Sequence, residues 1–102
     1  MEWPINYPHY LPAPSSFIEM MRGAFKAVQC AAVKPDENVV ILTDTNKLRV
    51  AEVLAGATVA VGGMPTIVVS PPSGVHGGQP PAPAIAACAR SDVFFLPTSF
   101  ST

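Results

Sequence analysis

The sequence of 102 residues predicts an α/β fold in which three helices alternate with three short parallel strands. Segments with apolar residues at three- and four-residue spacing alternate with short runs of β-branched and aromatic residues. Turns rich in Pro, Gly, Asn and Asp separate these segments. The strand-like runs are apolar on both faces, as in parallel strands that are covered on both sides. The resulting order, α-β-α-β-α-β, is typical of right-handed βαβ units.

An extended arm is predicted over residues 1–14. Prolines recur there at every second to fourth position and exclude a helix. The aromatic residues Trp3, Tyr7 and Tyr10 are too apolar for a solvated tail. Two interpretations therefore remain open: the arm lies over its own domain, or it reaches a partner.

The first helix is expected to begin at Ser15 or Ser16 and to end before Pro35. Ser16 and Glu19 have the spacing of a capping box, in which each side chain accepts a hydrogen bond from an otherwise unpaired amide of the other residue. Apolar residues at three- and four-residue spacing form a stripe that we expect to face the core. This stripe consists of Phe17, Met21, Phe25, Val28 and Ala32.

The elements after the first helix are each bounded by turn residues. Gly62-Gly63 is expected to end the second helix, because glycine readily takes the left-handed conformation that follows many helices. Residues 15–102 are thus predicted to form a Rossmann-like, three-layer α-β-α domain with a short parallel sheet. The expected elements are a strand at 39–42, a helix at 47–61, a strand at 66–70, a Pro/Gly loop at 71–83, a short helix at 84–90 and a strand at 93–96.

The sequence also predicts that this domain is incomplete on its own. Charged residues make up 13% of the chain, against about 25% in an ordinary soluble domain. None lies between Val53 and Ala89, although an independent domain keeps the outer faces of its helices charged. We therefore expect this chain to be either the N-terminal part of a longer polypeptide or a subunit that is buried in an oligomer. A slightly apolar independent domain is the alternative.

Composition disfavours several classes of protein. The net charge of -1 and the lack of a basic stripe disfavour nucleic-acid binding. The longest apolar run, from Val53 to Met64, is too short to cross a membrane, and no secretory signal opens the chain. Cys30 and Cys88 are expected to be buried thiols of a cytoplasmic protein, because their spacing matches no metal site.

Candidate site residues lie where the predicted strands end, since open α/β sheets bind ligands at the carboxyl ends of their strands. Asp44 follows the first strand and either caps the next helix or contacts a polar ligand. His76 lies in the Pro/Gly loop, and is either a solvated loop residue or a partner of Asp44, a pair too small for a metal site. Ser99, Ser101 and Thr102 follow the third strand, as a polar terminal loop or as part of an active-site loop. Glycine-rich nucleotide motifs are absent.

Several of these segments together resemble one enzyme family. Over about residues 36–102, the chain is similar to the N-terminal domain of the aminopeptidase T-like metalloenzymes, which include leucyl aminopeptidases and 2,5-dihydroxypyridine dioxygenases. The segments that carry the resemblance are the strand 40–45, Gly62-Gly63, the strand 67–69, Gly78-Gln79-Pro80-Pro81, Ser91-Asp92-Val93-Phe94 and the Ser/Thr-rich end 98–102.

This resemblance implies one wall of an inter-domain active-site cleft in a metal-dependent hydrolase or ring-cleaving dioxygenase. No cofactor or metal site is then expected on this chain, because the family binds its divalent metal (Zn, Co, Mn or Fe) in a C-terminal region. The implied partners are that missing domain or a partner subunit, further copies in a homo-oligomer, and a small-molecule or peptide substrate. The alternative is a non-catalytic interaction or scaffold subunit that assembles through its apolar helix faces and aromatic arm.

Overall fold

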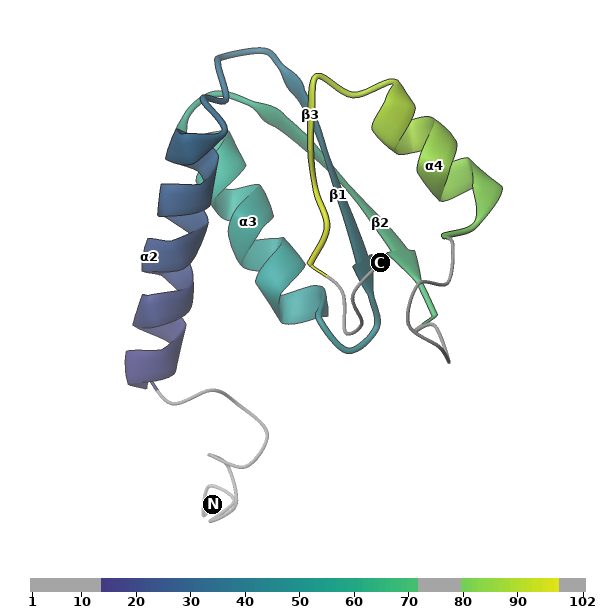
Figure 1. The fold of residues 1–102 in the computed structure, drawn as a ribbon. Coiled ribbons are helices and arrows are strands. Elements are labelled where there is room, and N and C mark those ends of the chain that lie inside the picture. Colours follow the sequence, from purple (N-terminus) through teal and green to yellow (C-terminus); the bar gives the residue numbers. More distant parts are fainter. Residues whose placement is uncertain (1–13, 72–79, 98–102) are drawn as a thin grey trace, which may run out of the picture.

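Helices and strands alternate in the predicted order in a computed structural model of the chain (Figure 1). The structure describes residues 14–71 and 80–97, so the predicted arm lies outside them except for Pro14, the first residue of a helix. The elements are α2 (Pro14–Cys30), β1 (Asn38–Asp44), α3 (Leu48–Ala60), β2 (Met64–Ser70), α4 (Ala82–Ala89) and β3 (Val93–Phe95).

The three strands form an open, all-parallel sheet in the order β2-β1-β3. Ile41 in the central strand pairs with Ile67 of β2 on one side and with Phe95 of β3 on the other. The chain therefore moves from β1 to one edge through α3, and then crosses back over β1 through α4 to reach the opposite edge. A right-handed crossover in each direction places α3 and α4 on opposite faces of the sheet.

Helices cover both faces of this sheet, which confirms the predicted Rossmann-like α/β fold. Figure 1 shows α2 and α3 together on one side of the sheet and α4 on the other. Val39 and Ile41 belong to the main core with residues of α2 and α3. Val40 and Leu42 are also buried but stand outside that core, because successive side chains of a strand point to opposite faces. The main core consists of Ala24, Val28, Val39, Ile41, Ala51, Leu54 and Ala57.

The buried side of α2 contains Val28, as predicted, but not the large residues of the predicted stripe. Its buried residues are Ala24 and Val28, 6% and 1% exposed, whereas Phe17, Met21 and Phe25 are exposed. The predicted stripe is therefore wrong for its largest members. The physical reason is that α2 packs chiefly on α3 rather than on the sheet, and small residues let two helices approach closely.

Two further details of α2 differ from expectation at its ends. The helix begins at Pro14, so Ser16 lies inside its first turn and does not occupy the predicted capping position. Ala32, expected on the buried stripe, lies beyond the helix with a φ of 54°, in the left-handed region that often ends helices.

The turn after α3 follows the prediction. Gly62 has a φ of 88°, and a Cβ atom there would lie 3.2 Å from Pro35 Cβ. The carbonyl of Gly62 accepts a hydrogen bond of 2.8 Å from the amide of Asp36. Gly63 is packed more tightly, since a Cβ atom would lie 2.8 Å from Thr58 Cγ2. Glycines here allow the end of α3 to contact the turn that leads into β1.

Strand β2 begins two residues earlier than predicted and contains Pro65. Because proline lacks an amide hydrogen, it is tolerated in a sheet at an edge strand, which β2 is. The other edge strand, β3, has three residues. No helix of the described ranges is long and apolar enough to cross a membrane.

Candidate functional site

The order of the strands places a topological switch point between β1 and β3. The connection that leaves β1 runs through α3 on one face, whereas β3 is reached through α4 on the other. In open α/β sheets, ligands bind in the crevice that such a divergence leaves at the carboxyl ends of the strands. The residues that end β1 and follow β3 therefore form the candidate site.

A buried hydroxyl joins these two strand ends. Thr43, 0% exposed, donates its Oγ1 hydrogen to the carbonyl oxygen of Pro97 at 2.7 Å, and its Oγ1 also lies 3.3 Å from the carbonyl oxygen of Asp44. The strand β1 is thus tied to the segment that follows β3, 54 residues away in sequence. Pro97 is the last described residue before the Ser/Thr-rich end.

Asp44, the last residue of β1, organises the turn into α3. Its carboxyl group is buried, and Oδ1 accepts hydrogen bonds from the amides of Asn46 at 2.9 Å and Lys47 at 3.2 Å. Its carbonyl accepts a further bond of 3.1 Å from the amide of Lys47. Asp44 therefore closes a turn before α3 and does not cap that helix, whose N-cap position is held by Lys47. Its contact with a polar ligand stays a prediction.

The other predicted site residues lie outside the described part of the chain. They are His76, Ser99, Ser101 and Thr102. The structure accordingly leaves the pairing of His76 with Asp44 as a prediction.

Acidic and sulfur ligands do not gather at this edge within residues 14–71 and 80–97, where no three His, Cys, Asp or Glu side chains come together to hold a metal ion. Asp92 lies at the opposite, amino end of the sheet, where its Oδ2 accepts a hydrogen bond of 2.7 Å from the amide of Asn38. These carboxyl groups therefore support the backbone at the two ends of the central strand.

The cysteines are free thiols, but the prediction that both are buried is wrong. Cys30 is the last residue of α2 and is exposed, because the buried face of that helix is formed by Ala24 and Val28. Cys88 in α4 is half-buried, and its burial raises the pKa of the thiol above its ordinary value. Neither lies at the carboxyl edge of the sheet.

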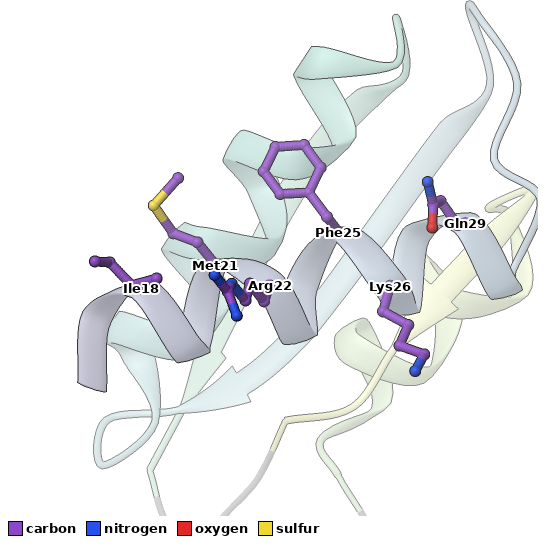
Figure 2. A pocket seen from close by; sticks show the side chains of 6 residues that line it. All are labelled: Ile18, Met21, Arg22, Phe25, Lys26 and Gln29. Atoms are coloured by element: carbon purple, nitrogen blue, oxygen red, sulfur yellow. The ribbon is translucent and has the colours of Figure 1, made fainter. Parts of the chain in front are cut away.

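The sequence did not predict a second surface of interest, a shallow groove along the outer side of α2 (Figure 2). Large apolar side chains that the sequence assigns to the core lie there in solvent. A different signal was present, because Ala24 and Ala27 lie beside Val28 on a face of small residues of the same helix. We name this surface the α2 groove; its lining consists of Ile18, Met21, Arg22, Phe25, Lys26 and Gln29.

Comparison with known proteins gives no further assignment. No family model, curated protein or solved structure matches this chain. The fold defines a small, open, parallel α/β domain, and such a fold does not by itself assign a function.

Proposed function

We propose that this chain is the N-terminal α/β domain of a metal-dependent enzyme, and that the carboxyl ends of β1 and β3 form one wall of its active-site cleft. The observation that supports this proposal is the switch point between these strands, where the Thr43–Pro97 hydrogen bond brings two chain segments together. Ligand sites of open α/β sheets lie at such points.

A second polypeptide segment is needed to complete this enzyme, and the exposed apolar surface supports such a partner. Eleven large apolar side chains of the described residues are exposed, among them Met64 at 55% and Phe94 at 49% on the two edge strands. Within the described residues, one face of the sheet is covered by α4, a helix of eight residues. Covering apolar surface releases about 25 cal/mol for each square ångström. Either a C-terminal domain or a partner subunit supplies this cover in the proposal.

The chemistry proposed for the complete enzyme follows the family resemblance. It is hydrolysis of a peptide or related small molecule, or oxidative cleavage of an aromatic ring. The divalent metal, Zn, Co, Mn or Fe, is held outside this chain and supplies Lewis acidity or redox chemistry. Within this chain, Asp44 holds the turn at the cleft, and Thr43 positions the segment that carries Ser99, Ser101 and Thr102, whose hydroxyls hydrogen-bond the substrate. We place the protein in the cytoplasm, because both cysteines are free thiols.

The test begins with the complete reading frame of the gene that encodes this chain. Its protein is purified, its metals are measured by mass spectrometry, and turnover is assayed with leucine p-nitroanilide and with 2,5-dihydroxypyridine. The proposal expects stoichiometric divalent metal and turnover of one substrate in the complete protein, and neither in the 102-residue chain. A reading frame that stops at Thr102, or tight metal binding by the 102-residue chain, would contradict it.

A non-catalytic interaction or scaffold subunit is the second candidate, and the α2 groove is the observation that favours it. A helix that exposes Met21 and Phe25 is suited to assembly rather than to solvent. Sedimentation velocity of the 102-residue chain tests this role. A homo-oligomer that dissociates when Phe25 is replaced by Asp supports the scaffold, whereas a monomer at all concentrations contradicts self-assembly.

A further inference from the structure

We propose that the α2 groove docks an acidic amphipathic helix of a protein partner. The lining residues of this surface all belong to α2, whereas the candidate site lies at the ends of β1 and β3. The test of the groove and the metal test can therefore fail separately. The spacing of the apolar side chains and the sign of the charges beside them indicate this class of partner.

The apolar part of the groove has the spacing of a helix-docking surface. Ile18, Met21 and Phe25 follow one another at three- and four-residue intervals and are all exposed. At a rise of 1.5 Å for each residue they span about 10 Å, close to two turns of a bound helix. Helices that dock in grooves use anchors at this spacing, and a methionine side chain adapts its shape to such anchors.

Charge decides which helix fits. Both charged side chains that line the groove, Arg22 and Lys26, are basic, and Figure 2 shows Lys26 projecting away from Met21 and Phe25. Among the described residues, an ion pair joins Arg49 to Glu52 on α3 at 3.9 Å. Neither basic residue of the groove forms an ion pair with a described acidic side chain. A partner helix with Glu or Asp beside its apolar stripe would pair with both.

A second copy of the chain fits this surface less well. Antiparallel pairing of two α2 helices through the groove would bring Arg22 and Lys26 of one copy beside those of the other. Like charges placed together in an interface disfavour that pairing. An acidic helix removes this repulsion and buries the same apolar side chains.

An anionic membrane is also a weaker match. A basic residue near such a membrane contributes about 1 kcal/mol, and stable anchoring needs clusters of about four to eight. The groove has two. The observations therefore favour a protein helix, and vesicles become a control in the test.

The test uses the full 102-residue chain and a fluorescein-labelled helical peptide of about 18 residues. The peptide is built from Leu, Ala and Glu, with a Leu stripe at helical spacing and Glu on both of its sides. A second peptide carries Lys in place of every Glu. Fluorescence anisotropy at low salt is expected to show saturable binding of the acidic peptide and at least about tenfold weaker binding of the basic one. No binding of the acidic peptide at about 1 mM overturns the proposal.

Two charge-matched double variants locate the contact. Arg22→Glu with Lys26→Glu reverses the charges of the groove, and Arg49→Glu with Arg90→Glu makes the same change in net charge elsewhere. All four side chains are exposed, so circular dichroism is expected to show folded proteins. The groove variant is expected to lose about tenfold in affinity and the control less than about twofold. Equal losses in the two variants overturn the proposal.

Other occupants of the groove give distinct results. A dimer that both Met21→Ala and Phe25→Ala dissociate in sedimentation would show a second copy there. Trp3 is the single tryptophan, so a red shift of its emission in the Arg22→Glu, Lys26→Glu variant would show the N-terminal arm there. Binding to phosphatidylserine vesicles that exceeds binding to the acidic peptide would show a membrane surface. Each of these results overturns the acidic-helix proposal.

Discussion

Helices α2 and α3 follow the same sequence pattern but occupy different environments. On α3, apolar residues at helical spacing predict a stripe that is buried or half-buried throughout, with Leu54 and Ala57 in the main core. This stripe consists of Val50, Val53, Leu54, Ala57 and Val61. On α2, Val28 of the predicted stripe is buried, but the largest residues of that stripe are exposed, and Ala24 outside it is buried. The periodic pattern therefore located the buried face of one helix and only part of that of the other.

The contacts of the two helices explain the difference. Helix α3 packs on β1 and β2 with one side and on α2 with the other. It is therefore enclosed on two sides, and Ala51 and Thr58 are buried beside its apolar stripe. Helix α2 packs chiefly against α3, so only one narrow face of α2, made of small residues, is buried. The size of a side chain is thus a poor guide to burial in a helix that has one neighbour.

The largest expected effect is at Leu54, which tests whether α3 carries the core. Leu54→Ala removes a side chain that is 7% exposed and belongs to the main core. We expect the free energy of unfolding to fall by about 3 kcal/mol, measured by urea denaturation. Met21→Ala on α2 is the matched control and is expected to cost less than about 1 kcal/mol. Equal losses at the two sites would remove the distinction between the helices.

The next effect concerns the tie between β1 and the segment after β3. Thr43→Val keeps the shape of the side chain but leaves the carbonyl of Pro97 without its 2.7 Å hydrogen bond. We expect a loss of about 1 kcal/mol in thermal or urea unfolding, since the part-buried carbonyl loses its hydrogen-bond donor. Thr66→Val, at an exposed position of β2, is the control and is expected to be nearly neutral.

A smaller, stabilising effect is expected from glycine replacement in the two helices. Gly56 in α3 and Gly23 in α2 have no atom within 4 Å of an added Cβ. Gly56→Ala and Gly23→Ala are each expected to raise the free energy of unfolding by about 0.5–1 kcal/mol, because alanine restricts the unfolded chain. Gly63→Ala is the contrasting variant and should destabilise, because its Cβ would lie 2.8 Å from Thr58. Destabilisation by Gly56→Ala would indicate a contact on the outer side of α3.

The smallest expected effect is a difference in thiol reactivity between Cys30 at the end of α2 and Cys88 in α4. Cys30 is exposed, whereas burial raises the pKa of the half-buried Cys88. Iodoacetamide at mildly alkaline pH is expected to modify Cys30 first, as mass spectrometry of the intact protein would show. The raised pKa means that the folded chain holds the Cys88 proton more tightly than the unfolded chain. Its contribution to stability is therefore present below the ordinary thiol pKa and is lost as the pH rises through the raised value.

The carboxyl edge of the sheet could be predicted only in part. The position of Asp44 after a buried strand marked it as a turn or ligand residue, and the structure shows the turn. The contact between Thr43 and Pro97 could not be predicted, because the order of the strands decides which distant segments meet. The family resemblance, the metal and the substrate remain predictions.

Local patterns were enough to predict which segments of this chain become helices and strands and that the strands run parallel. The run Val39-Val40-Ile41-Leu42 has to be buried on both faces, and Gly62 has to take a left-handed conformation, whatever surrounds them. The strand order and the buried side of α2 depend instead on which elements lie next to one another. Such contacts join residues far apart in the chain, and the same local pattern is compatible with more than one arrangement of neighbours.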